Sequence, residues 1–191
     1  MKKAASSPCD CGYHGVRFYE NEKSLAQMVA EFLADGLNEG DPALVVATPV
    51  QRAAISRALV VRGVDVVSLQ RCDDLVLLDA EETLSSFLKD GALDAKVFED
   101  RMSALIERAC QGRTNCIIRV YGQMVDVLWQ QGKRDLAIDL EILWNQLART
   151  KRFSLLCGYA MGSFYKDAHV DDVRRQHTHV VSADGTAAAV A

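Results

Sequence analysis

The sequence predicts an α/β fold of three layers, a mostly parallel β-sheet with helices on both faces. Short apolar runs alternate with longer segments in which apolar residues recur at helical spacing. One run, residues 42–48 (PALVVAT), is continuously apolar, as is typical of a strand buried on both faces of a parallel sheet. Ligands of such sheets bind near the carboxyl ends of the strands, so residues that follow strands carry most of the functional information.

The first strand is predicted over residues 15–20 (GVRFYE). Ser24 and Gln27 have the spacing of a capping box, which predicts the start of the next helix. Gly40 ends that helix, because glycine readily adopts the left-handed conformation of a helix C-cap.

The following elements continue the alternation. Thr48 and Pro49 are typical of a helix N-cap and first turn. Later elements are strands at 64–70 (VDVVSLQ) and 74–80 (DLVLLDA), a short helix at 81–89, a longer helix capped by Asp94, a strand at 115–122 (NCIIRVYG), helices on either side of Gly132, and a strand at 153–159 (FSLLCGY). Residues 161–181 show a weaker pattern of helix and strand.

Length and charge limit the functional classes. The 191 residues suit one domain, predicted over 13–181, with disordered ends at 1–12 and 182–191. A net charge of −4 argues against direct nucleic-acid binding and against an anionic membrane surface. There is no apolar run of the roughly 18 residues that a membrane span needs, and no apolar segment of a secretory signal, so we expect a cytoplasmic protein.

The six cysteines fall into two groups. Four are predicted to be small buried apolar residues: Cys72, Cys110, Cys116 and Cys157. Cys9, Cys11 and His14 form a C-x-C-x-x-H cluster of zinc-ligand types, but a closed site needs a further ligand and no second pair stands at ligand spacing. We therefore predict no metal, while metal or redox sensing through this cluster stays an alternative.

The turn at residues 19–24 (YENEKS) occupies the position of a phosphate-binding loop. No glycine lies within residues 16–35, so the backbone cannot converge on an anion, and Glu20 and Glu22 would repel one. We expect no nucleotide hydrolysis and no cofactor. An ordinary strand-to-helix turn is the other interpretation of this segment.

Motifs of nucleophilic catalysis are missing from the sequence. There is no G-x-S-x-G elbow. His177 and His179 share a face only if they lie on a strand, and a core or solvated pair is favoured over a metal site. The chain is therefore not expected to be an enzyme.

Polar residues within apolar elements are the better functional candidates. Arg119 interrupts an apolar strand, and a buried guanidinium needs a partner, for which Glu141 and Glu20 are candidates. Glu141 and Asn145 stand four residues apart on a predicted helix and share one flank. They lie either on the rim of an apolar stripe or in a polar pocket or partner surface.

Several segments together resemble the MEDS domain, the sensory domain of DcmR-type regulators. The resemblance starts at residues 14–49, through His14, Phe18, Tyr19, Phe32, Leu33, Gly36, Leu37 and Gly40, and extends to about residue 181 through residues 77–98, 118–132, 140–147 and 153–159. One departure is Gln123, which stands where the family usually has a glutamate. A role that needs a carboxylate at that position is thereby in doubt.

The resemblance implies a non-catalytic sensory domain of prokaryotic signalling, similar to RecA- and KaiC-like ATPase domains but without their phosphate loop. It also implies sensing of small hydrocarbon derivatives. Such domains often accompany a helix-turn-helix or a kinase, and neither fits this length. We therefore expect a separate signalling protein as partner; homo-oligomerisation stays open.

The predicted site lies at the strand ends and binds a small organic molecule or a signalling partner. A pocket of tyrosines with a few polar groups suits a small organic ligand. The candidate ligand-binding residues are His14, Tyr19, Glu20, Arg119, Tyr121, Gln123, Glu141, Asn145 and Tyr159. The alternatives are a protein-interaction regulator of a kinase or sigma-factor pathway and a protein with residual nucleotide binding.

Overall fold

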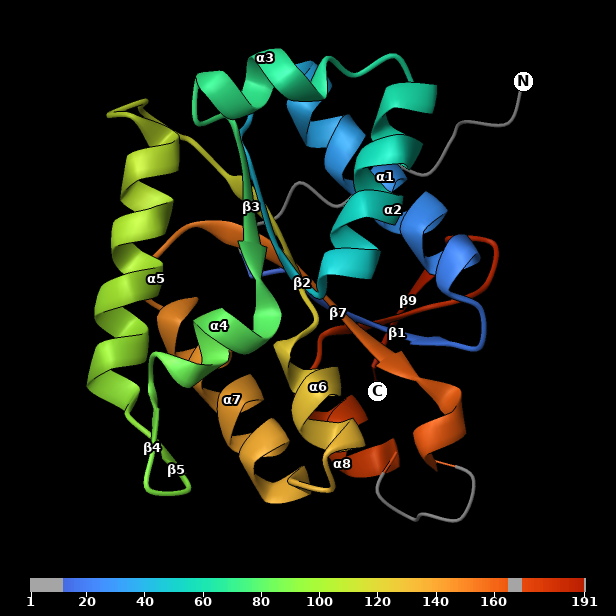
Figure 1. Ribbon diagram of the computed structural model, residues 1–191, viewed down its shortest axis with the longest axis vertical. Coiled ribbons are helices and arrows are strands. Elements are labelled where there is room, and N and C mark those ends of the chain that lie inside the picture. The colour runs from blue at the N-terminus through green and yellow to red at the C-terminus, as the bar shows by residue number, and fades with distance from the viewer. Residues whose placement is uncertain (1–11, 165–169, 191) are drawn as a thin grey trace.

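A computed structural model describes residues 12–164 and 170–190 (Figure 1). Its main sheet contains β1 (His14–Tyr19), β2 (Ala43–Ala47), β3 (Leu75–Asp79), β6 (Ile118–Gly122), β7 (Phe153–Ala160), β8 (His179–Val181) and β9 (Ala187–Ala189). The strand order is β3-β2-β6-β7-β1-β8-β9, and every pair is parallel except β8–β9. The predicted α/β fold with a mostly parallel sheet is confirmed.

The helices are α1 (Glu22–Glu39), α2 (Pro49–Val61), α3 (Val66–Arg71), α4 (Ala80–Ser85), α5 (Ala95–Cys110), α6 (Met124–Gln130), α7 (Arg134–Leu147) and α8 (Val170–Arg175), with a 3-10 turn η1 at Met161–Phe164. A small antiparallel ribbon, β4 (Leu88–Lys89) and β5 (Ala92–Leu93), precedes α5.

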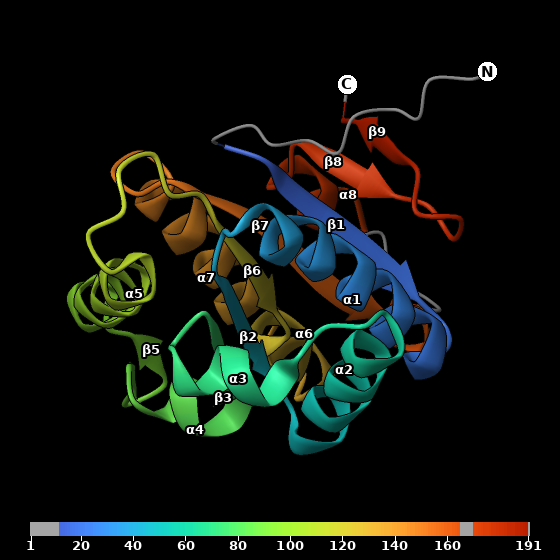
Figure 2. The same ribbon diagram turned by 90° about the horizontal axis from the view of Figure 1, so that it is seen from above.

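Two apolar cores divide the helices between the faces of the sheet (Figure 2). Leu33 of α1, Ile55 of α2 and Val66 of α3 belong to one core. The helices of the other core are α4 to α8, which contribute buried side chains such as Trp144 and Val173. The chain crosses to the first face after β1 and β2 and to the second after β3, β6 and β7.

Helix caps explain most of the element boundaries. The side chain of Thr48 accepts the Gln51 amide, Asp94 caps α5, and Gly40 takes a left-handed φ of 86°, as predicted. The start of α1 differs from the prediction. Asn21, not Ser24, is its N-cap, because the Asn21 side chain accepts the amides of Lys23 and Ser24.

Two segments differ from the sequence prediction. Residues 64–70 were predicted as a strand, but Asp65 caps the helix α3, so that prediction is wrong. The segment 182–190, expected to belong to a disordered tail, turns back and adds the edge strand β9 to β8. The predicted N-terminal arm lies almost wholly outside the described residues, as do Cys9 and Cys11 of the predicted cysteine–histidine cluster.

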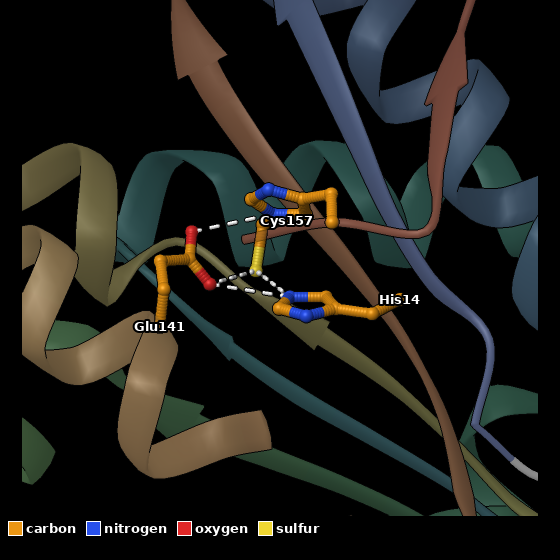
Figure 3. Close-up of side chains that lie close together, drawn as sticks. His14, Glu141 and Cys157 are labelled. Atoms are coloured by element: carbon orange, nitrogen blue, oxygen red, sulfur yellow. Dashed lines mark hydrogen bonds and ion pairs between the residues drawn. The ribbon is translucent and has the colours of Figure 1, made fainter. Parts of the chain in front are cut away.

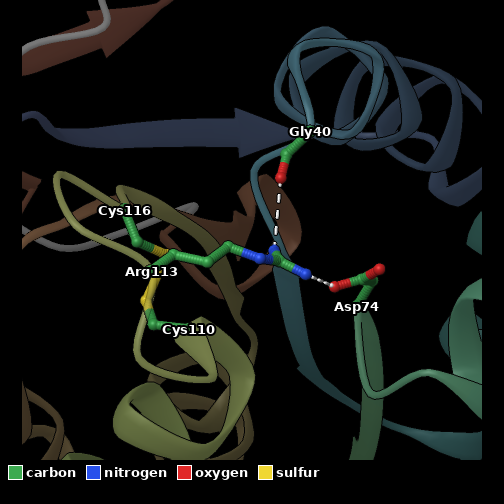
Figure 4. Close-up of a disulfide and its surroundings, with 5 residues drawn as sticks. All are labelled: Gly40, Asp74, Cys110, Arg113 and Cys116. Atoms are coloured by element: carbon green, nitrogen blue, oxygen red, sulfur yellow. Dashed lines mark hydrogen bonds and ion pairs between the residues drawn. A yellow bond between two sulfur atoms is a disulfide. The ribbon is translucent and has the colours of Figure 1, made fainter.

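The cysteines also differ from the prediction. Cys157 is buried, but Cys72 is exposed, and Cys110 and Cys116 form a disulfide instead of two buried thiols. The disulfide closes the loop between α5 and β6 (Figure 4). Arg113, inside this loop, donates to the Gly40 carbonyl at 3.2 Å and forms an ion pair with Asp74, so the loop is held against the ends of α1 and α3.

None of the described helices has the length and apolar character needed to cross a bilayer.

Candidate functional site

Four side chains of metal-ligand types meet under α7, between that helix and the sheet. They are His14, Glu141, Cys157 and His177, hereafter the α7 cluster. Figure 3 shows how His14, Glu141 and Cys157 point toward one another. All four are buried, and one ligand atom of each lies within 4.8 Å of the others. Among the described residues this is the group whose spacing would suit a metal ion.

Four different elements position the α7 cluster. Val16 and Cys157 are register partners in β1 and β7, and His14 stands two residues before Val16, so His14 and Cys157 point to the same face. Glu141 projects from the middle of α7, beside the core residue Trp144. His177 follows α8 and is brought in as the chain enters β8.

The carboxylate of Glu141 is the centre of the cluster. Its Oε2 lies 3.2 Å from His14 Nε2 and 3.5 Å from Cys157 Sγ, while Oε1 lies 3.3 Å from His177 Nε2. Tyr159 donates its hydroxyl to Oε1 at 2.8 Å. Cys157 Sγ is also 3.5 Å from His14 Nε2. The structure therefore gathers two ring nitrogens, a thiol and a hydroxyl around one carboxylate.

The outer ring nitrogens of both histidines are fixed by acceptors. Asn145 donates its amide to the Gln176 carbonyl at 2.9 Å, which turns its oxygen toward His14 Nδ1, also at 2.9 Å. His177 Nδ1 lies 2.7 Å from the Val173 carbonyl, which can only accept. Both Nδ1 atoms thus carry protons, and each ring turns its Nε2 toward the Glu141 carboxylate.

Burial controls the protonation of the cluster. It lowers the pKa of His14, and the neighbouring His177 lowers it further, so the His14 ring is neutral near pH 7. Burial acts to raise the pKa of Glu141, but the adjacent imidazoles bring it below its usual range. Burial also raises the pKa of the Cys157 thiol.

A second buried polar group lies at the carboxyl ends of the strands. Its centre is Asp126 of α6, which accepts from the Tyr19 hydroxyl at 2.8 Å, the Gln130 amide at 2.7 Å and the Ala160 backbone at 3.0 Å. Beside it Gln123 accepts from the Thr48 backbone at 3.1 Å. We call Tyr19, Asp126 and Gln130 the strand-end network.

The other predicted site residues lie apart from these groups. Arg119 and Tyr121 are buried on the α1 face, and Glu20 is exposed. The Arg119 guanidinium donates to the Phe32 carbonyl at 3.0 Å and lies over the Phe32 ring, so α1 supplies contacts for this buried cation. Glu141, which we considered as its partner, lies within the α7 cluster.

The predicted residues are thus divided among three places. His14, Glu141, Asn145 and Tyr159 come together, whereas Tyr19 and Gln123 lie at the strand ends. Cys157, His177 and Asp126 were not among the candidates. His177 carried a signal, the H-x-H pair, but the two histidines separate: His179 packs on Tyr13, and His177 enters the cluster.

A surface groove runs between α1 and α2. It has a volume of about 790 Å³ and is closed at one side by the turn at residues 183–185. Val50, Ala54, Ala58 and Val61 give it an apolar wall, and Lys23, Glu31, Arg57 and Arg62 give it charged edges. The groove begins at the first turn of α1, beside the carboxyl end of β1.

Comparison with known proteins identifies a family. No curated protein matches the chain. The profile of the MEDS family, the methanogen/methylotroph DcmR sensory domain, matches residues 13–178. That range includes every residue of the α7 cluster and the strand-end network. The chain therefore belongs to the MEDS family of sensory domains.

Proposed function

We propose that this MEDS domain is a non-catalytic sensor that binds a small organic molecule in the groove between α1 and α2 and passes the signal to a separate protein. The observation that carries the proposal is the groove itself. Its volume of about 790 Å³ is within the range of small-molecule sites, and it combines an apolar wall with a few charged groups.

The start of α1 supports a ligand other than nucleotide phosphate. A phosphate at a helix N-terminus binds free backbone amides. Here the Asn21 side chain already accepts the amides of Lys23 and Ser24, at 2.8 and 3.1 Å. The adjacent Glu20 and Glu22 add negative charge. We propose that the scaffold is a RecA/KaiC-like fold without phosphate binding, working in the cytoplasm.

A thermal-shift screen of small hydrocarbon derivatives tests the proposal, because a ligand that binds only the folded state raises Tm. Ala58→Trp should fill the groove and abolish the shift, whereas Ala53→Trp, exposed on the same helix outside the groove, should preserve it. A shift that survives Ala58→Trp contradicts the groove as the site. ATP with magnesium should give no binding heat in calorimetry.

Exposed valines favour a second function for the same surface, docking of the signalling partner. Val61 is 87% exposed and Val50 is 66% exposed, and both line the groove. Val61→Asp should disrupt a partner complex, and Val67→Asp, an equally apolar exposed position on α3, should not. If Val61→Asp abolishes signalling but leaves the ligand-induced Tm shift unchanged, the edge of the groove is the binding surface for the partner.

A further inference from the structure

We infer that the α7 cluster is a binding site for a divalent transition metal of the zinc type, with His14, Glu141, Cys157 and His177 as its four ligands. This inference concerns the opposite face of the sheet from the groove, and it does not depend on the proposed function.

The first argument is the direction of the ring nitrogens. Both Nδ1 atoms donate outward, to Asn145 and to Val173, which leaves both Nε2 atoms aimed at the Glu141 carboxylate. His177 Nε2 is within ion-pair distance of Glu141, yet it is a buried atom without a hydrogen-bond partner in the described part of the chain. Two imidazole nitrogens and a carboxylate that converge in this way are the donor types of a zinc site.

The second argument is distance. A tetrahedral metal with bonds of about 2.0 Å to nitrogen and oxygen and about 2.3 Å to sulfur holds its N and O ligands roughly 3.3 Å apart and its S and N ligands roughly 3.5 Å apart. Glu141 Oε2 and His14 Nε2 are 3.2 Å apart, and Cys157 Sγ is 3.5 Å from each. These three atoms therefore have the spacing of one face of a coordination tetrahedron.

The third argument is charge. A divalent cation with one carboxylate, one thiolate and two neutral imidazoles forms a neutral centre, which is the arrangement that a buried site tolerates. Metal binding displaces the Cys157 thiol proton to solvent.

The surrounding residues complete the site. Asn145 holds the His14 ring and Tyr159 holds Oε1 of the carboxylate, leaving Oε2 for the metal. Such outer hydrogen bonds orient metal ligands. Two imidazoles, a carboxylate and a thiolate suit Zn²⁺ and its spectroscopic substitute Co²⁺ better than Mg²⁺ or Ca²⁺, which prefer oxygen. With four protein ligands the site is closed.

Cobalt titration of the full chain, after metal removal with a chelator, tests the inference. We expect one Co²⁺ per chain, with the strong visible absorption of tetrahedral cobalt and a near-ultraviolet thiolate-to-cobalt band. Cys157→Ser should abolish that band, and Cys72→Ser, which changes an exposed free thiol, should keep it. His177→Asn should weaken affinity by roughly tenfold or more, and His179→Asn should not.

The alternative source of a thiolate-to-cobalt band is the pair of N-terminal cysteines, Cys9 and Cys11. If Cys9→Ser with Cys11→Ser removes the thiolate band while Cys157→Ser retains it, the inference is wrong. Absence of stoichiometric cobalt binding by the wild-type chain overturns it as well. Cadmium-113 NMR of the wild type settles the case in which a variant does not fold: a shift typical of one thiolate with nitrogen and oxygen ligands supports the α7 cluster, and a two-thiolate shift contradicts it.

Discussion

The α7 cluster and the strand-end network each bury one carboxylate, but they surround it with opposite chemistry. Asp126 receives hydrogen bonds from the hydroxyl of Tyr19, the amide of Gln130 and the backbone of Ala160. Glu141 receives hydrogen bonds from the Tyr159 hydroxyl and the Cys157 thiol and otherwise faces two imidazole nitrogens.

The difference lies in the kind of partner. Hydrogen-bond donors balance the charge of Asp126 within the protein, and the strand-end network therefore needs no added ion. Around Glu141, by contrast, two imidazoles and a thiol supply atoms that can coordinate a metal. A buried carboxylate thus indicates a metal site only together with the ligand types around it.

The largest expected effect is that of metal withdrawal. Zinc at a thousandfold excess over its Kd should raise the free energy of unfolding by about 4 kcal/mol, because only the folded chain assembles the four ligands. Urea denaturation with zinc and with chelator measures the difference. The Asp126→Asn variant should show the same zinc-dependent gain. Equal stability of the wild type with and without zinc would mean that the α7 cluster, like the strand-end network, binds no metal.

Removing the balanced carboxylate should come next. Asp126→Ala leaves three donors without their acceptor, among them the buried Tyr19 hydroxyl, and we expect a loss of about 3 kcal/mol in the free energy of unfolding. Asp139→Ala, an exposed carboxylate on α7, is the control and should change it by less than about 0.5 kcal/mol. Cobalt affinity should be the same in both variants, and a large change in Asp126→Ala would mean that the two sites are coupled.

The outer hydrogen bond of the α7 cluster gives a smaller effect. Asn145→Ala frees the His14 ring to rotate and should lower cobalt affinity by about 10- to 100-fold while the thiolate band remains. Gln146→Ala, its exposed neighbour on α7, should bind cobalt like the wild type. Unchanged affinity in Asn145→Ala would show that the ring is held by packing alone.

The parts of the fold that sequence reasoning predicted are the local ones. Thr48 and Asp94 cap helices through amides three residues away, so their signal is contained in a short stretch of chain. The segment at 64–70 was wrongly predicted as a strand because valines are common in strands. The cap at Asp65 and the tertiary packing of Val66 make it helical instead.

The α7 cluster could be predicted only in part. Glu141 and Asn145 share a helix flank, which helical spacing reveals. His14 and Cys157, 143 residues apart, meet because β1 pairs with β7, and no local pattern encodes that pairing. The sequence treats His177 and His179 as one pair, but β8 begins at His179, and the two rings therefore lie in different environments. The sequence did not mark Asp126 as a site residue, since a single acidic residue in an apolar helix commonly lies at the edge of its apolar face.

The smallest effect, and the finest test of the balanced site, is its pH dependence. Burial raises the pKa of Asp126 above 3.8 despite its three donors. The folded state then binds more protons than the unfolded state between 3.8 and the folded pKa, so the contribution of Asp126 to stability is greatest below this window and falls as pH rises through it. Asp126→Asn cannot titrate, and the difference in unfolding free energy between wild type and variant should decrease with rising pH across the window. An increase would mean that the hydrogen-bond donors outweigh burial and that the pKa of Asp126 in the folded state lies below its unfolded value.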